Sequence, residues 1–200
     1  VEQHGDSIEA FFPVARTSIG NIAGTVGVEG SFPESFRAFA MNGAEILYRA
    51  SLPDPWVSRE LFEVQNRSRA IDNTAYMIAP NTGSLIMPSE SGGEPTVIDG
   101  ALGGKSAIYD YKGTVLSRTD TVGDAYTASE INIEALRHYR ENAKFQNWIP
   151  YLKTEIFSKL YDRPIWPKNL PPMNHEDAGK VFGDSIKKLI DSGTFTKKSK

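Results

Sequence analysis

A strand, a helix and a second strand follow one another within residues 19–48, and this succession constrains the fold more than any other stretch. Residues 19–28 are small, apolar and glycine-rich, which is typical of a buried strand whose end lies close to another backbone. Pro33 suits the first turn of a helix, which we expect over 35–42 before an Asn-Gly stop. The apolar run 44–48 predicts a second buried strand, and such alternation favours an α/β protein.

Further elements follow downstream. Residues 60–72 carry apolar side chains at helical spacing, and the β-rich run 74–80 predicts a strand. Later in the chain we expect a hairpin of strands 107–109 and 114–117, a strand over 125–133, and helices over 134–142 and 177–193. The fold class predicted from these patterns is therefore mixed α/β.

Residues 24–49 carry a specific pattern. An acidic residue, Glu29, is followed by the triplet Phe32-Pro33-Glu34 at the start of the predicted helix. This stretch resembles the nucleophile segment of the nitrilase superfamily of carbon–nitrogen hydrolases, with spacing similar to that of aliphatic amidases. In that family a cysteine closes the strand two positions before the acidic residue. The position that corresponds to the cysteine is Gly27.

The resemblance implies a chemistry for this position. A cysteine thiolate attacks the amide or nitrile carbon, and the backbone N–H after it, here that of Val28, helps to hold the oxyanion. Glycine cannot act as the nucleophile, and the chain contains no cysteine. Thr25 and Ser31 are nearby hydroxyls, but the local sequence shows no His or Lys base beside either, so we do not favour them. As written, the chain is predicted to be inactive.

The family's general-base glutamate and its lysine both precede the cysteine. The chain begins at Val1, too late to hold either, so we expect it to be a fragment or a truncated product. Glu2 stands about where amidases of this family carry a further glutamate that positions the substrate. Two interpretations of Glu2 stay open, that active-site role and an ordinary exposed loop carboxylate.

The resemblance also implies an architecture. Residues 1–142 would supply the C-terminal half of a four-layer α-β-β-α sandwich, and residues 143–200 a C-terminal extension whose tail is disordered. Residues 144–172 are rich in aromatics and prolines. In the family such an extension commonly wraps over a partner subunit, which predicts a homo-oligomer; the alternative is that it covers its own domain.

Other residues near the motif have structural or functional interpretations. Glu29 and Arg37 are expected to fix the turn, through each other or through neighbouring backbone. Arg49 and the residues after it are expected to line the mouth of the pocket. Trp56 either contacts the substrate or covers the core under a proline-rich loop.

Composition excludes several classes of function. The net charge of −3 gives no electrostatic basis for nucleic-acid binding, and no apolar run is long enough to cross a membrane. His4, His138 and His175 lie far apart without metal-ligand spacing, and no cofactor is predicted. The segment 104–106, Gly-Lys-Ser, lacks the spacing of a phosphate-binding loop. The resemblance favours the cytoplasm.

Two functions remain open from the sequence. The first is a fragment or variant of a carbon–nitrogen hydrolase that acts on small amides or nitriles. The second is a non-catalytic subunit that keeps the fold and its aromatic C-terminal surface for assembly. Gly27 favours the second for this chain, whereas the intact residues around it favour the first for its lineage.

Overall fold

The computed structural model describes residues 5, 7–51, 60–89, 92–98, 103–121, 123–168 and 170–198. Its contacts divide the chain into two compact units, residues 2–151 and residues 152–200. No helix among the described residues combines the length and the apolar character that a membrane crossing requires.

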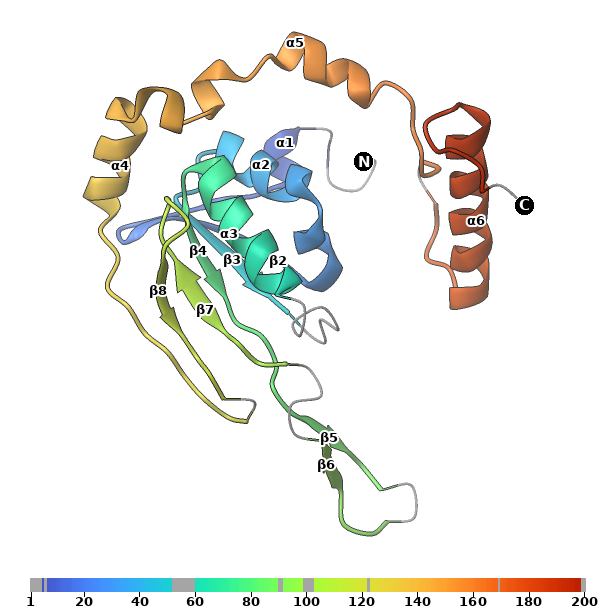
Figure 1. Ribbon diagram of the computed structural model, residues 1–200, viewed down its shortest axis with the longest axis horizontal. Helices are drawn as coiled ribbons and strands as arrows, with labels where there is room; N and C mark the ends of the chain where they lie inside the picture. Colours follow the sequence, from blue (N-terminus) through green and yellow to red (C-terminus); the bar gives the residue numbers. More distant parts are fainter. Residues whose placement is uncertain are drawn as a thin grey trace. The chain divides into compact units, whose positions relative to one another are not determined.

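A six-stranded sheet forms the centre of the first unit, in the order β1-β2-β3-β4-β7-β8. The strands β2, β3 and β4 run parallel, whereas β1, β7 and β8 pair antiparallel with their neighbours (Figure 1). The strands are β1 (Ala15–Thr17), β2 (Gly20–Val26), β3 (Ile46–Ala50), β4 (Tyr76–Ala79), β7 (Ala107–Tyr109) and β8 (Val115–Arg118). The mixed α/β class expected from the sequence is confirmed, and the four-layer sandwich stays a prediction.

The helices of the first unit mostly follow the sequence patterns. Pro33 opens α2 at its first turn, and Gly43, with φ +90°, follows its C-cap residue Asn42, as predicted. The helices are α1 (Ile8–Phe11), α2 (Pro33–Met41), α3 (Leu61–Asn73) and α4 (Ile133–Asn142), with short 3₁₀ turns η1 (Gly27–Ser31), η3 (Lys144–Gln146) and η4 (Ile149–Tyr151). The predicted strand 19–28 therefore ends at Val26, and the chain turns at Gly27.

The main core lies between one face of the sheet and the helices α2 and α3 (Figure 1). Leu47 and Met77 point from the sheet into this layer, where Phe36, Phe39 and Phe62 of the two helices meet them. Burying each such side chain contributes roughly 1.5–3 kcal/mol. This layer fixes the positions of β2, β3 and α3, the elements that carry the candidate site.

The opposite face of the sheet is covered only in part. Ile46 and Tyr76 form a second cluster with Leu136 of α4. Farther along the same face, toward the carboxyl ends of the strands, Val26 and Tyr48 are exposed. This second face is therefore covered by α4 at one end and open at the other.

The strand predicted over 125–133 is wrong. This stretch forms no ladder, and Tyr126 is 93% exposed. The Tyr76 hydroxyl instead accepts the N–H of Asn132 and donates to its carbonyl, both at 3.1 Å. Ile131 and Ile133 pack into the second cluster, so their apolar character reflects packing beneath α4 and not strand pairing.

Two segments contribute no strand to the six-stranded sheet. The two-stranded hairpin of β5 (Leu85–Met87) and β6 (Thr96–Ile98) projects away from the six-stranded sheet (Figure 1). The second unit contains α5 (Thr154–Phe157), η5 (Ser158–Leu160) and the predicted last helix, α6 (His175–Asp191). Residues 143–151 stay with the first unit because the buried Asn147 is hydrogen bonded to Thr74 and to the carbonyl of Arg140.

Candidate functional site

The carboxyl ends of three parallel strands meet at one edge of the sheet. Gly27 follows β2, Ser51 follows β3, and Asn81 lies just beyond β4, bridged to Ser51 in the parallel sense. Ligands of open α/β sheets bind outside the carboxyl ends of their strands. This edge is therefore where the fold favours a site.

Gly27 occupies the turn between β2 and η1 in a left-handed conformation, with φ +61°. Among the described residues, none beyond the immediate neighbours of Gly27 has an atom within 4 Å of a Cβ atom built on it. A side chain at this position would therefore extend into open space, at the cost of backbone strain of about 1–2 kcal/mol for a residue other than glycine. A tight turn from strand to helix that exposes one side chain is the geometry of a nucleophile elbow.

Arg49 lies beneath this turn, and its expected place at the mouth of a pocket stays a prediction. Its exposed fraction is 2%. The alternation of side chains along β3 places Arg49 on the same face as Leu47, which the helices cover. Register along the strand therefore directs the side chain of Arg49 toward the helices.

The guanidinium of Arg49 binds both ends of η1 and the helix behind it. Nε donates to the carbonyl of Gly27 at 3.3 Å, Nη2 to Oγ of Ser31 at 3.2 Å, and Nη1 to Oε1 of Gln65 at 2.8 Å. Its Cζ lies 5.2 Å from the ring centroid of Phe62, a favourable position for a cation over an aromatic face. Because Ser31 accepts from Arg49, its hydroxyl is engaged in holding the turn.

Gly30 makes this arrangement possible. A Cβ on Gly30 would lie 2.3 Å from Nε and 2.5 Å from Cδ of Arg49. Sequence reasoning missed both Gly30 and Gln65. The sequence places an arginine inside an apolar strand that follows a glycine-rich turn. This combination could have indicated Gly30.

The other predicted residues of the turn lie toward solvent or on α2. Val28 is 66% exposed, and Glu29 is exposed while its carbonyl accepts the N–H of Phe32 at 3.3 Å. Arg37 lies half-buried on α2, where burial lowers its pKa and the charge of Asp72 partly offsets that shift. No ion pair joins Glu29 and Arg37, two residues that the structure describes.

Two predicted site residues, Glu2 and Trp56, lie outside the described residues. Within the described ranges, no three acidic or histidine side chains come together in a way that would hold a metal ion. The segment 104–106 packs against the end of β4, where the hydroxyl of Ser106 accepts the N–H of Asn81 at 2.9 Å.

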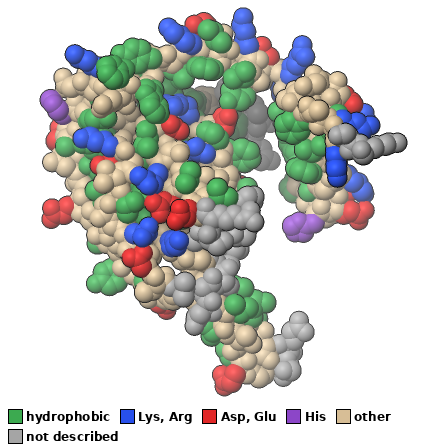
Figure 2. Space-filling view, viewed as in Figure 1, with side chains coloured by type: hydrophobic (Ala, Val, Ile, Leu, Met, Phe, Trp, Pro, Cys, Tyr) green, Lys and Arg blue, Asp and Glu red, His purple; other side chains and the backbone are tan. Residues whose placement is uncertain are grey.

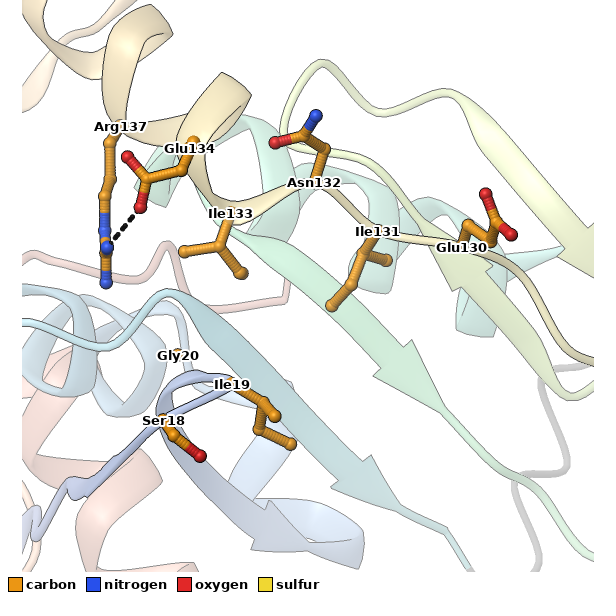
Figure 3. Close-up of a pocket in the computed structure, with 9 residues that line it drawn as sticks. All are labelled: Ser18, Ile19, Gly20, Glu130, Ile131, Asn132, Ile133, Glu134 and Arg137. Carbon is orange, nitrogen blue, oxygen red and sulfur yellow. Dashed lines mark hydrogen bonds and ion pairs between the residues drawn. The ribbon is translucent and has the colours of Figure 1, made fainter.

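A hollow of about 590 Å³ lies at the opposite edge of the sheet, beside the start of β2 (Figure 3). Ile19 and Gly20 face Ile133 and Arg137 across it, and Arg137 pairs with Glu134. Because β2 has seven residues, about 20 Å of strand separates this hollow from Gly27.

Glu45 and Arg137 fix the helix α4 at this amino-terminal edge. Nε of Arg137 donates to Glu45 at 2.7 Å, and the N–H of Asn21 donates to the same carboxylate at 2.9 Å. The hydrogen bond from Arg137 is the main cause that lowers the pKa of Glu45, whose side chain is 5% exposed. The bonds at this edge therefore serve helix packing.

Comparison with known proteins places the chain in a family. The carbon-nitrogen hydrolase profile matches residues 2–141. The chain belongs to the carbon-nitrogen hydrolase family. This membership confirms the resemblance to the nitrilase superfamily that the motif at 24–49 indicated.

Named relatives of this carbon-nitrogen hydrolase chain are amidase-like. A deaminated glutathione amidase from Synechocystis is 30% identical over 83 residues, which cover 41% of this chain and 30% of that protein. A beta-ureidopropionase from Arabidopsis thaliana is 24% identical over 176 residues, 83% of this chain and 42% of that protein. The chain thus spans less than half the length of these relatives.

Solved structures share the fold. A carbon-nitrogen hydrolase from Helicobacter pylori has a TM-score of 0.61 at 22% identity, over 76% of this chain and 53% of that one. The Nit3 protein of Saccharomyces cerevisiae, a member of the nitrilase superfamily, has a TM-score of 0.53 at 18% identity, over 76% and 48%. At these identities the likeness shows the fold alone.

Proposed function

We propose that this chain carries the nucleophile end of a hydrolase for the carbon–nitrogen bonds of small amides or nitriles, with Gly27 in the place of the nucleophile. The observation that carries the proposal is the geometry of Gly27. It closes a parallel strand, turns with a positive φ, and leaves open space where a side chain would extend. The amidase names of the relatives support small amides as the substrate class.

The chemistry of a thiol at this position follows from the family. Its thiolate adds to the amide carbon, a C–S bond forms, and the electrons of the C=O bond move to oxygen, where the N–H of Val28 stabilises the charge. Collapse of this intermediate expels the amine as ammonia once it is protonated, and water then hydrolyses the thioester. Gly27 has no atom that can start this sequence, so we expect no turnover from the chain as written.

The test uses the complete reading frame that encodes this chain, as it stands and with Gly27→Cys. We expect no ammonia from acetamide, propionamide or acetonitrile without the substitution. With it, ammonia should appear and mass spectrometry should detect an acyl adduct on the introduced thiol. A folded Gly27→Cys protein with neither adduct nor turnover would remove the proposal, and turnover by the unsubstituted protein would show that position 27 is not the nucleophile's place.

A second function is favoured by the surface of residues 152–198, which makes a homo-oligomer the alternative role. Hydrophobic side chains lie along the visible face of this unit (Figure 2). Its exposed large apolar residues are Ile156, Phe157, Leu160, Tyr161, Ile165, Trp166, Leu170, Phe182 and Phe195. Large apolar side chains exposed in such number favour an interaction site.

Sedimentation of the intact chain and of a version that ends after Tyr151 tests this alternative. We expect the intact chain to sediment as an oligomer and the shortened one as a monomer. Equal association states for the two would show that residues 152–200 do not mediate assembly.

A further inference from the structure

We propose that Arg49 is a positioning residue for the site at position 27. It holds the peptide group between Gly27 and Val28 so that the N–H of Val28 faces the open side of the turn. This inference rests on the proposed function, because it assigns the orientation of the oxyanion donor to a buried side chain that does not itself contact the substrate.

The argument starts from the geometry of one peptide group. A trans peptide is planar, and its C=O and N–H point in opposite directions. Arg49 approaches the carbonyl of Gly27 from the buried side and donates to it at 3.3 Å. The N–H of Val28, on the other side of the same plane, is therefore directed away from Arg49.

The open side of the turn is also where a side chain at position 27 would extend. A Cβ on Gly27 has no atom of the described part of the chain within 4 Å there, apart from its immediate neighbours. The N–H of Val28 belongs to the first turn of η1, whose N–H groups have no partner within a 3₁₀ helix. A nucleophile at position 27 and the N–H of Val28 would thus point into the same space.

The orientation is rigid because the guanidinium is held at several atoms. Nη2 donates to Ser31, the last residue of η1, and Nη1 donates to Gln65 of α3. The fork of an arginine fits such divergent acceptors, whereas the single ammonium of a lysine does not. Arg49 therefore ties both ends of the turn to a helix of the core.

Gly30 leaves free the space that the side chain of Arg49 occupies. Nε, Cδ and Cγ of Arg49 all lie within 3.0 Å of the place where its Cβ would be. No positive φ is required of Gly30, so an alanine there is excluded by the arginine and not by the backbone. Gly30→Ala should therefore displace the guanidinium without altering Arg49 itself.

The absence of cysteine from the chain allows a direct measurement, because Gly27→Cys introduces a single thiol. Iodoacetamide alkylates a thiolate by displacing iodide as the C–S bond forms, without an oxyanion. With p-nitrophenyl acetate, the thiolate adds to the carbonyl carbon, the oxygen takes the charge, and collapse releases p-nitrophenolate and leaves the S-acetyl group. Dividing the acetylation rate by the alkylation rate cancels the thiolate fraction, which both reactions share, so a change in this ratio between variants of one site reports a change in oxyanion stabilisation.

Gly92→Cys is the matched control. Gly92 also has a positive φ, +75°, and a Cβ there also meets nothing within 4 Å. It lies between β5 and β6, away from the carboxyl ends of the parallel strands. We expect the rate ratio of Gly27→Cys to exceed that of Gly92→Cys by about tenfold or more.

Substitution of Arg49 should then abolish this advantage. In the Gly27→Cys background, Arg49→Met and Arg49→Lys are expected to lower the ratio to that of the control while the alkylation rate changes by less than about threefold, because only the oxyanion donor is misdirected. Gly30→Ala should give the same loss. In combination with Arg49→Met it should have no further effect, since two changes that act through one contact are not additive.

Circular dichroism and thermal melting show which variants are folded. If Arg49→Met does not fold, the rate ratio of Gly30→Ala, which keeps Arg49, tests the inference. Equal ratios for Gly27→Cys and Gly92→Cys would overturn both the oxyanion role of Val28 and this inference. A high ratio in Gly27→Cys that survives Arg49→Lys and Gly30→Ala in folded protein would overturn the inference alone and leave the proposed function standing.

Discussion

The two ends of β3 use arginine in different ways. At the carboxyl end, the buried Arg49 donates to the backbone and side chains of a turn and so shapes the space around position 27. At the amino end, the half-exposed Arg137 pairs with Glu45 and attaches α4 to the sheet. The hollow of about 590 Å³ lies beside the second pair and not the first. The hollow therefore lies where α4 packs against the sheet. The candidate site at position 27 is recognised instead by its backbone geometry.

The largest expected difference between the two ends is in stability. Arg49→Met should lower the free energy of unfolding by about 3 kcal/mol, because it removes a buried guanidinium and leaves the part-buried carbonyl of Gly27 and amide of Gln65 without their donor. Arg137→Met should cost clearly less, because its guanidinium is exposed and water can replace its bonds. Urea unfolding of both variants measures the difference, and equal losses would remove the contrast between the ends.

Glycines at the two ends of β2 offer a second comparison. Gly20 has φ +122°, a region that is essentially restricted to glycine, and a Cβ there would lie 3.2 Å from Cδ1 of Ile133. We expect Gly20→Ala to cost about 2–3 kcal/mol in unfolding free energy. A thermal melting midpoint unchanged from that of the parent chain would contradict this prediction.

The pH dependence of stability tests the amino end. The folded-state pKa of Glu45 is lowered, chiefly by the hydrogen bond from Arg137, so its contribution is present above its ordinary pKa of about 4.5 and is lost as the pH falls through the lower folded-state value. Glu45→Gln should therefore cost about 1.5 kcal/mol at pH 7 and progressively less below pH 4.5. Unfolding free energies of parent and variant across this range measure the effect. A loss that stays constant down to pH 3 would show that it does not come from the charge.

The smallest effect is expected at the turn itself. Gly27→Ala should cost only about 1 kcal/mol, because its φ of +61° is the left-handed region that other residues enter at modest cost and the new methyl group meets no atom. A loss as large as that of Gly20→Ala would show that the space at position 27 is not open. Denaturant unfolding of the two alanine variants under the same conditions makes this comparison.

Local patterns were enough to predict most elements of the first unit. Pro33 and the Asn42-Gly43 pair bound α2 within two residues of the prediction, because capping depends only on neighbours in the chain. The stretch 125–133 failed for the opposite reason. Its alternating residues have the composition of a strand but form no backbone ladder with any described strand, and only the position of α4 explains what Ile131 and Ile133 contact.

The candidate site divides in the same way. The motif at 24–49 located Gly27 by itself, since the order of residues along a strand, a turn and a helix is carried by the chain. The roles of Arg49 and Gly30 were not predictable from that order. Their contact joins residues 19 positions apart in sequence and depends on the parallel pairing of β2 with β3.

The sequence alone determined the family and the α/β alternation and led to the proposal that Gly27 stands at the nucleophile's place, because these depend on residue identity and short-range spacing. The tertiary structure decided that no described residue beyond its neighbours fills the space beside position 27 and that Arg49 lies beneath it. Direction and burial of a side chain are set by what packs against it, and at this turn those neighbours come from β3 and α3, which only folding brings together.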